Sequence, residues 1–348
     1  MPKPTPRPSP APPASPAPSE IAVLGGTGFI GTHLVHRLVA AGRRVVVMAR
    51  NPRNLPLVFD DPLVRVERGS IGDGDAVART IAGCRTVVNL AHGGGGGSFE
   101  EVRHAMVGGA ETVARACRDS LAKRLIHVGS IASLYLGPQR APVTGRTPPD
   151  PREAERGDYA RAKVLCDRML LDLHRSENLP VVILRPGVVV GEGTSPFHSG
   201  VGLYNNDQHC IGWNAGRNPL PFVLVEDVAD AIISACDADG IEGQCYNLVG
   251  DVRPSARDYT AMLAADLGRP LRYHPQSATG LWLVDVAKWS IKRATGRAVP
   301  MPAKRDFLSR GMKARFDCTD ARHDLGWHPS ADPEHFRQRA ILVHLPHG

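Results

Sequence analysis

The stretch Ile21-Ala22-Val23-Leu24-Gly25-Gly26-Thr27-Gly28-Phe29-Ile30-Gly31 decides the fold of this chain. An apolar run of strand length passes into a glycine-rich turn, and the turn opens a run with helical periodicity at roughly 29–41. In a dinucleotide-binding βαβ unit, such glycines allow a tight turn, a close approach of the backbone to the pyrophosphate and close packing of helix on strand. The free N–H groups and the positive dipole end of the helix then face the phosphates. The residues predicted to hold the cofactor here are Gly25, Thr27, Gly28, Phe29, Ile30 and Gly31.

Strand-like and helical patterns alternate outward from this turn. Strands are expected at 21–24, 44–49, 64–67, 86–90, 123–128 and 180–185, and helices at roughly 29–41, 73–82, 99–118 and 156–177. After about 190 the pattern becomes irregular, with short helices at 226–236, 256–266 and 280–294 and little strand. Alternation of this kind predicts an α/β fold, a doubly wound parallel sheet of the Rossmann type with a smaller C-terminal substrate-side lobe.

Composition divides the chain into three segments. Residues 1–19 hold nine of the 30 prolines, so they cannot bury apolar area and are expected to form a disordered, Pro/Ala-rich tail. The tail also lacks the apolar run of a secretory signal. We predict an NAD(P)-binding Rossmann domain over 20–190 and a substrate-binding lobe over 191–348 that is interleaved with it.

The bulk numbers favour an ordinary enzyme of the cytoplasm. Hydrophobic content of 42% suits a globular core, and the net charge of +7 is not gathered into basic-aromatic runs, so no nucleic-acid partner is expected. The seven cysteines are scattered without a C-x-x-C pair, which favours reduced thiols over a disulfide framework, and no metal site is expected. No transmembrane segment is predicted. The amphipathic stretch 281–293 leaves a peripheral membrane contact open, and a homodimer is equally compatible with the sequence.

The end of the second strand indicates which dinucleotide binds. An acid at this position accepts a hydrogen bond from the ribose 2′-hydroxyl of NAD, whereas an arginine pairs with the 2′-phosphate of NADP. This strand runs into Arg50, with Arg53 as a second contact, so the prediction is NADP, with NAD as the alternative. The alternative interpretation is that Arg50 is a solvent-exposed arginine at the start of a loop, with no role in cofactor binding. Ser70 is expected near the adenine and Ala91 at the crevice. The glycine run 93–97 that follows is either a lid or a flexible insert.

A phenol and an ammonium lie four residues apart at Tyr159 and Lys163, on one face of a predicted helix. A lysine charge one turn away favours the tyrosinate form and suits the pair to general acid–base work. The expected strand 123–128 leads into Ser130 and Ser133, 29 and 26 residues before the tyrosine. A hydroxyl there can orient a substrate oxygen while Tyr159 exchanges its proton.

Six landmarks in order make the chain resemble the extended short-chain dehydrogenase/reductase family, of the NAD(P)-dependent epimerase/dehydratase type, over roughly 20–340. They are the glycine turn, Tyr159-x-x-x-Lys163, and the segments 185–191, 222–229, 245–248 and 324–329. The resemblance implies hydride transfer between nicotinamide C4 and a carbonyl or carbinol carbon. It also implies Tyr159 as general acid/base, Lys163 on the nicotinamide ribose, and Pro186 and Val188 beside the nicotinamide.

Departures from the family pattern narrow the function. The family serine fits Ser130 best, and Ser133 remains an alternative. The segment 130–132 lacks the acid and base of the dehydratases, Met106 replaces an active-site asparagine, and 218–221 lacks the arginine typical of nucleotide-sugar binders. We predict an oxidoreductase acting on a small molecule with a hydroxyl or carbonyl group. A sugar epimerase working through a transient ketone is one alternative, and a catalytically silent cofactor-binding regulator is another.

Overall fold

The computed structural model describes residues 21–345 except 93–97, 121, 207 and 298, so the predicted tail and the glycine run lie outside the described residues. The strands are β1 (Ile21–Leu24), β2 (Val45–Ala49), β3 (Val64–Arg68), β4 (Thr86–Asn89), β5 (Arg124–Val128), β6 (Val181–Pro186), β7 (Val188–Val190), β8 (Gly202–Asn205), β9 (His209–Trp213), β10 (Phe222–Leu224), β11 (Cys245–Leu248) and β12 (Arg272–Gln276). The α-helices are α1 (Phe29–Ala40), α2 (Gly74–Ile81), α3 (Phe99–Arg103), α4 (Gly109–Arg118), α5 (Asp158–Glu177), α6 (Val225–Asp237), α7 (Ala256–Leu267), α8 (Ala278–Ala294), α9 (Lys304–Arg310), α10 (Thr319–Leu325) and α11 (Pro333–Ala340).

Seven parallel strands form the main sheet in the order β11-β6-β5-β4-β1-β2-β3. β1 pairs with β2 on one side and with β4 on the other, so the chain reverses its direction of travel across the sheet at β1. In doubly wound sheets a crevice opens at the carboxyl ends of the strands at this switch point. The glycine turn follows β1 directly and therefore lies in the crevice.

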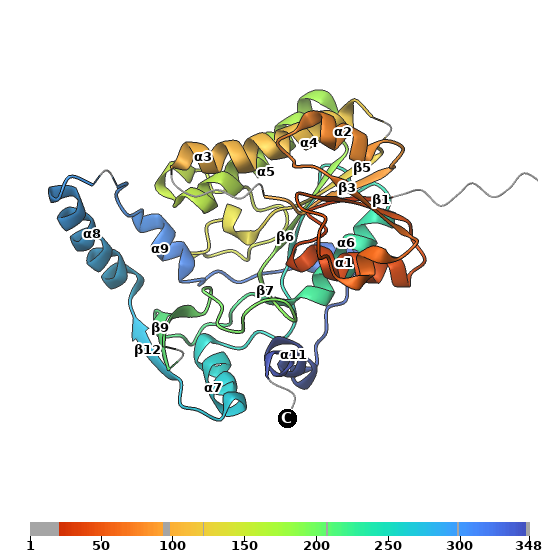
Figure 1. Ribbon diagram of the computed structural model, residues 1–348. Helices are drawn as coiled ribbons and strands as arrows, with labels where there is room; N and C mark the ends of the chain where they lie inside the picture. Colours follow the sequence, from red (N-terminus) through yellow and green to blue (C-terminus); the bar gives the residue numbers. More distant parts are fainter. Residues whose placement is uncertain (1–20, 93–97, 121, 207, 298, 346–348) are drawn as a thin grey trace, which may run out of the picture.

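Helices cover both faces of the sheet because its strands are apolar on both sides (Figure 1). On β1, Ile21 and Val23 pack in the core shared with α1 and α6, whereas Ala22 and Leu24 pack in the core shared with α2, α4 and α5. Strands buried on both faces are typical of parallel sheets. The predicted doubly wound α/β fold is confirmed.

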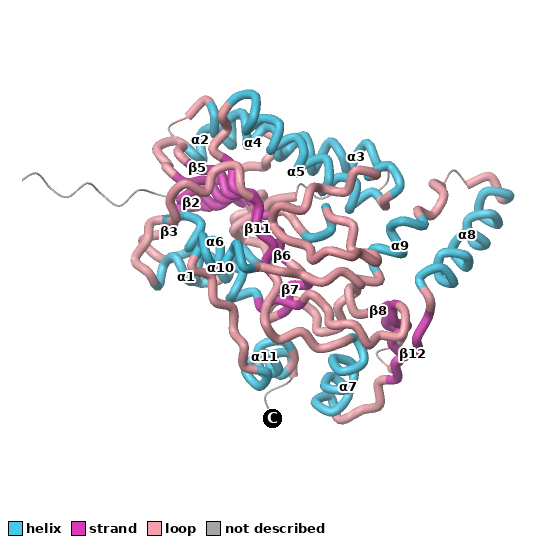
Figure 2. Tube along the Cα trace, turned by 180° about the vertical axis from the view of Figure 1, so that it is seen from behind, coloured by secondary structure: helices cyan, strands magenta, loops and turns pink. Residues whose placement is uncertain are grey.

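The smaller lobe contains more strand than the sequence predicts. β7 and β10 form a parallel pair, and β8, β9 and β12 form a three-stranded sheet (Figure 2). The expectation of little strand after 190 is wrong because these strands are short, and β10 and β12 pair with partners distant in sequence. Two elements of the segment 191–348, α6 and β11, belong to the layers of the main sheet. The lobes are thus interleaved, and the domain boundary at 190 stays a prediction.

The helix predicted over 99–118 is interrupted. A π-helical turn at His104–Gly108 separates α3 from α4. The turn buries Met106 against Ala162 and Cys166 of α5. A wider turn of this kind changes which side chains face the neighbouring helix. An apolar contact with α5 therefore occupies the position where the resemblance expects an asparagine.

Candidate active site

The glycine turn has the geometry that a dinucleotide requires. Gly25 has φ +84°, and a Cβ there would lie 2.7 Å from the backbone nitrogen of Ala91, so only glycine fits. A Cβ on Gly31 would collide with the carbonyl oxygen of Gly25, which fixes the helix close to the turn. Gly28 is the N-cap of α1, and no side chain caps that helix end among the described residues. The turn and the N–H groups that begin α1 are therefore free to meet a pyrophosphate.

The other predicted cofactor residues lie along the same edge of the sheet. Arg50 follows β2, Ser70 follows β3, and the side chains of Arg50, Arg53 and Ser70 are exposed. Within the described part of the chain, no carboxylate pairs with Arg50 or Arg53. Ala91 follows β4, and its N–H donates to Asn89 Oδ1 at 3.1 Å. Two unpaired guanidinium groups are thus available where a ribose phosphate would lie.

Tyr159 and Lys163 lie on the first turns of α5, which starts after Gly157. The Tyr159 side chain is 52% exposed, whereas Lys163 is 6% exposed. The Lys163 ammonium lies 5.9 Å from the centroid of the Tyr159 ring. In the described ranges no carboxylate neutralises Lys163, so its charge is available to the phenol and to a bound ribose.

The Lys163 charge also acts on His92 and His127, two histidines that are not among the predicted site residues. Burial and, to a smaller extent, the Lys163 ammonium together lower the pKa of His127, on β5, to about 3. Burial followed by Lys163 also lowers the pKa of His92, with a smaller contribution from Arg50. His127 Nδ1 lies 3.4 Å from Asn89 Nδ2, and its Nε2 has no partner in the described structure. The sequence feature that could have identified His127 as a candidate site residue is a histidine inside an otherwise apolar strand.

The structure separates the two candidate serines. Ser130 caps a short 3₁₀ turn by accepting a hydrogen bond from the Ala132 N–H. It also lines the cavity between the main sheet and the smaller lobe that is described below. Ser133 is fully buried, and its hydroxyl donates to Asp167 Oδ2 at 2.7 Å. The same carboxylate accepts from Arg185 Nε at 2.8 Å. Ser133 is thus committed to a buried polar cluster outside the cavity, and we carry Ser130 forward alone.

A cavity of about 600 Å³ lies between the main sheet and the smaller lobe. It brings together six of the predicted site residues, namely Phe29, Ile30, Ser130, Tyr159, Pro186 and Val188. The other predicted residues lie outside its lining. Apolar side chains dominate the remaining wall, among them Ile131, Leu136, Val189, Leu203, Trp213 and Met312. Such a surface suits an uncharged ligand with apolar bulk.

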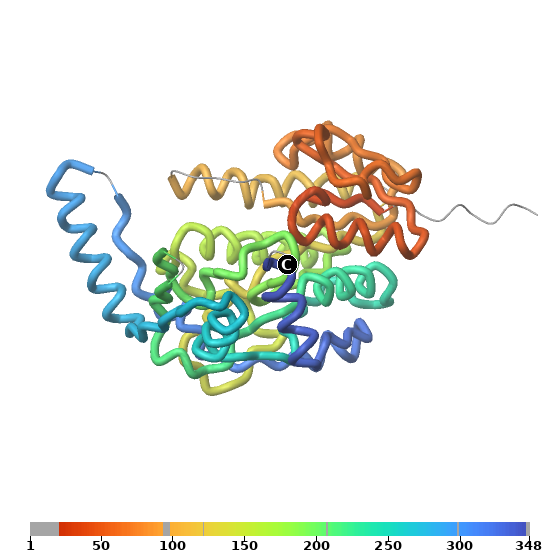
Figure 3. The backbone as a smooth tube through the Cα atoms, turned by 60° about the horizontal axis from the view of Figure 1, so that its bottom comes forward, coloured from red at the N-terminus to blue at the C-terminus, as the bar shows by residue number. Residues whose placement is uncertain are grey.

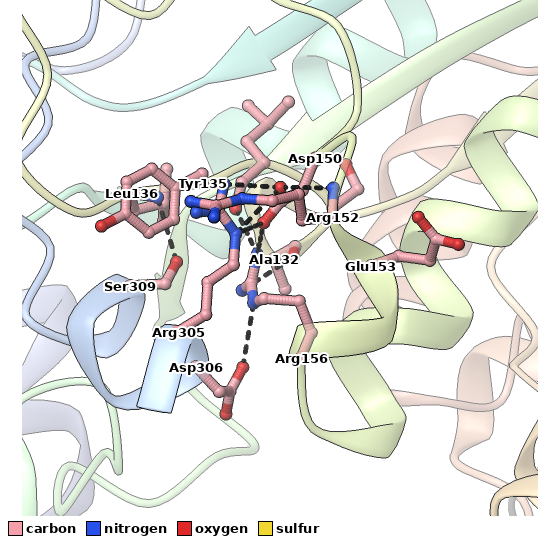
Figure 4. A network of polar contacts seen from close by, with 12 residues as sticks. Ala132, Tyr135, Leu136, Asp150, Arg152, Glu153, Arg156, Arg305, Asp306 and Ser309 are labelled. Carbon is pink, nitrogen blue, oxygen red and sulfur yellow. Dashed lines mark hydrogen bonds and ion pairs between the residues drawn. The ribbon is translucent and has the colours of Figure 1, made fainter. Parts of the chain in front are cut away.

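The two arginines that line the cavity, Arg156 and Arg310, already have carboxylate partners, and Figure 4 shows the network around Arg156. Arg156 pairs with Asp150 at 2.9 Å and with Asp306 at 3.1 Å. Arg305 pairs with Asp150 at 2.7 Å, and Arg310 with Asp306 at 3.0 Å. Burial alone would raise the pKa of Asp150, but hydrogen bonds from Arg305, the Arg152 N–H and Arg156 lower it. The Asp150 carboxylate therefore stays charged and holds the guanidinium groups of Arg156 and Arg305 in place.

Comparison with known proteins identifies the family. Residues 21–248, well over half of the chain, match the NAD dependent epimerase/dehydratase family. The chain belongs to that family. The resemblance drawn from the six landmarks is thereby confirmed, as is the prediction of an NAD(P)-dependent enzyme of this type.

Members of the family similar to this chain carry out several reactions. The dTDP-6-deoxy-L-talose 4-dehydrogenase (NAD(P)(+)) of Kitasatospora kifunensis is 29% identical over 73% of this chain and 81% of its own length. The UDP-glucose 4-epimerase of Vibrio cholerae is 24% identical over 93% of this chain and 95% of its own. Among solved structures, the UDP-glucuronic acid 4-epimerase from Bacillus cereus in complex with UDP-glucuronic acid and NAD shares the fold. Its TM-score is 0.69 and its identity 18%, over 92% of this chain and 97% of that one.

Membership in the family confirms a nicotinamide dinucleotide as cofactor, and the open glycine turn fits one. The choice between NADP and NAD is a separate question. Among the residues that the structure describes, no helix combines the length and apolar character needed to cross a membrane.

Proposed function

We propose that this protein is an NADP(H)-dependent oxidoreductase of the cytoplasm that reduces a carbonyl group, or oxidises the matching alcohol, on a neutral small molecule with apolar bulk. The observation that carries the proposal is the composition of one cavity. Ser130 and Tyr159 supply the polar groups of the reaction, whereas both arginines of the wall are held by carboxylates.

Each of the site residues has a separate role in the proposed reaction. The Ser130 hydroxyl donates a hydrogen bond to the substrate oxygen and fixes its position. The Tyr159 hydroxyl gives a proton to that oxygen during reduction, or takes one during oxidation. Lys163 stabilises the tyrosinate with a charge that no carboxylate neutralises in the described part of the chain. The bound cofactor supplies or accepts the hydride, and Pro186 and Val188 form the apolar wall beside it.

Among the described residues that line the cavity, no arginine or lysine lacks a carboxylate partner, which supports a neutral substrate. The segment 218–221 lacks the arginine typical of nucleotide-sugar binders, and its Leu220 is buried in the core of the smaller lobe. The Arg253 guanidinium donates to the backbone oxygens of Gly250 and Phe316 at 2.6 and 3.3 Å. Arg217 is exposed and lies outside the described cavity lining. A diphosphate inside the described cavity would therefore meet Arg156 and Arg310, which already have carboxylate partners, whereas an apolar group gains from burial.

Preference for NADP rests on Arg50 and Arg53. Both are exposed beside the cofactor turn, and neither has a carboxylate partner within the described ranges. A 2′-phosphate would pair with a free guanidinium there.

A nucleotide-sugar epimerase is the second candidate because the similarity to the UDP-glucose 4-epimerase of Vibrio cholerae spans 93% of the chain. Epimerisation uses the same tyrosine, serine and nicotinamide but returns the hydride to the opposite face of a transient ketone. It gives no net consumption of cofactor, which separates the two candidates experimentally.

The test measures NADPH consumption over a panel of neutral carbonyl compounds with the wild type, Tyr159→Phe and Tyr246→Phe. Tyr246 is the matched control because its phenol donates to Asp324 rather than facing the cavity. We expect turnover in the wild type and the control, and a loss of about 10²–10⁴-fold in Tyr159→Phe with unchanged cofactor affinity. Retention of more than about a tenth of kcat in Tyr159→Phe would contradict the assignment.

A thermal-shift experiment decides between the candidates. The protein saturated with NADP is titrated with UDP and dTDP. We expect no stabilisation by either nucleotide at millimolar concentration. Stabilisation that disappears in Arg217→Ala would favour the epimerase and overturn the neutral substrate.

A further inference from the structure

Helix α8 stands apart from the body of the protein, joined to it through β12 on one side and α9 on the other (Figures 1 and 3). Of the residues in this 17-residue helix, Ala278 is the one that is buried in the described structure. The helix is nevertheless fixed in place. Trp282 and Trp289 donate their indole N–H groups to the backbone oxygens of Pro302 and Val299, each at 2.9 Å. Both tryptophans thus face the returning segment before α9.

The opposite face of α8 carries an apolar stripe with helical spacing. We name it the α8 stripe, and its residues are Leu283, Val284, Ala287, Ile291 and Ala294. All five are exposed, and Leu283, Val284 and Ile291 are 55%, 51% and 67% exposed. Spacings of three and four residues place them side by side along the helix. An exposed stripe of this kind on a rigid helix indicates an interaction surface.

Basic residues are concentrated on α8 and on the segment that follows it, with Lys304 over the Trp282 ring on the face opposite the stripe. From α8 to the start of α9 the described basic residues are Lys288, Lys292, Arg293, Arg297 and Lys304, against one acid, Asp285. Lys288 pairs with that acid at 3.3 Å, and the remaining four have no carboxylate partner among the described residues. The surface thus combines apolar side chains that can enter an acyl boundary with cations that attract anionic headgroups.

We propose that the α8 stripe and its basic flank dock this protein on an anionic membrane surface. The helix lies in the interface instead of spanning it, because no described helix meets the requirements of a span. Charge argues against a second copy as the occupant. A two-fold contact through the stripe would bring the same unpaired cations of both copies together. An anionic surface neutralises them.

Docking would place the cavity beside the membrane. α8 packs on α9, and Asp306, Ser309 and Arg310 of α9 line the cavity. The surface proposal does not depend on the proposed reaction, since it rests on α8 alone.

Co-sedimentation of the full chain with sonicated vesicles tests the proposal. One set contains phosphatidylcholine alone, and the other contains phosphatidylcholine with about a third phosphatidylglycerol. We expect binding to the anionic vesicles, weaker binding as salt is raised, and at least tenfold weaker binding to the neutral ones. Leu283→Ser/Ile291→Ser should reduce partitioning at least tenfold. Leu57→Ser, at another exposed leucine (86% exposed) far from α8 in the sequence, should not change it.

A second pair of variants isolates the charge. Lys288→Glu/Lys292→Glu should abolish binding to anionic vesicles. Arg79→Glu/Arg85→Glu makes the same change in charge at exposed positions away from α8 and should leave most of the binding intact. Circular dichroism and light scattering on every variant verify folding and oligomeric state. Failure of the wild type to bind anionic vesicles would overturn the proposal. So would a dimer in solution that Leu283→Ser/Ile291→Ser dissociates, because a second copy would then cover the stripe.

Discussion

The two ends of the active-site crevice use arginine in opposite ways. At the cofactor end, Arg50 and Arg53 are exposed and have no carboxylate partner among the described residues. At the substrate end, Arg156, Arg305 and Arg310 share Asp150 and Asp306, and the part formed by Arg156, Arg305 and the two carboxylates is largely buried (Figure 4). Free guanidinium groups can recruit an anion, whereas paired and buried ones hold the wall in place. The count of arginines near a site therefore says little about the charge of its ligand until their partners are known.

The largest effect is expected from breaking the substrate-end network. Asp150→Asn removes the carboxylate shared by Arg156 and Arg305 and leaves two buried or half-buried guanidinium groups with weaker partners. We expect a loss of about 3–5 kcal/mol in the free energy of unfolding, seen as a fall of roughly 10 °C in Tm. Asp172→Asn, at an exposed pair with Arg175, is the control and should change Tm by less than about 2 °C.

The same variant has a pH signature. The pKa of Asp150 is lowered in the folded protein, so its contribution is complete above the unfolded value of about 4 and is lost as the pH falls through the folded value. The difference in unfolding free energy between wild type and Asp150→Asn should therefore shrink at acid pH. A difference that stays constant down to pH 3 would show that the carboxylate charge is not what stabilises the network.

The cofactor end is tested by Arg50→Asp. A charge-assisted hydrogen bond contributes about 1.5–3 kcal/mol, so NADPH affinity should fall roughly 10- to 150-fold. NADH affinity should hold or rise, because the new acid can accept from the 2′-hydroxyl. Isothermal titration with both cofactors measures this, with Arg79→Asp as the control. Tighter binding of NADH than NADPH by the wild type would contradict the role given to Arg50.

The smallest effect is expected from giving the substrate end an arginine without a carboxylate partner, as at the cofactor end. Asp306→Ala frees Arg310 and removes one of the two partners of Arg156. If the carboxylate partners are what prevent these arginines from binding anions, the variant should bind phosphate. Phosphate at about ten times its Kd for the variant should then raise the Tm of the variant by a few degrees. The wild type and Glu334→Ala, which loses an acid from a surface pair with Arg337, should show no such rise. An equal rise in all three proteins would remove pairing as the cause.

Local sequence determined much of this protein. The run from Ile21 to Gly31 dictates a strand, a turn that only glycine can make and a helix start open to phosphate. The spacing of Tyr159 and Lys163 fixes two side chains on adjacent turns, whatever the rest of the chain does. These features are set by neighbours within a few residues, so a pattern in the sequence suffices to predict them.

Tertiary structure decided what depends on distant partners. The sequence favours Ser130 but leaves Ser133 as an alternative, and in the fold Asp167, 34 residues after Ser133, accepts the Ser133 hydroxyl while Ser130 lines the cavity. Arg156 is held in the wall by Asp150, which is six residues away, and also by Asp306, which is 150 residues away and is brought to it by the fold. The strand β12 likewise forms because it pairs with β9, about 60 residues earlier in the chain. Burial and pairing over such separations depend on the whole fold, and no local pattern encodes which partner arrives.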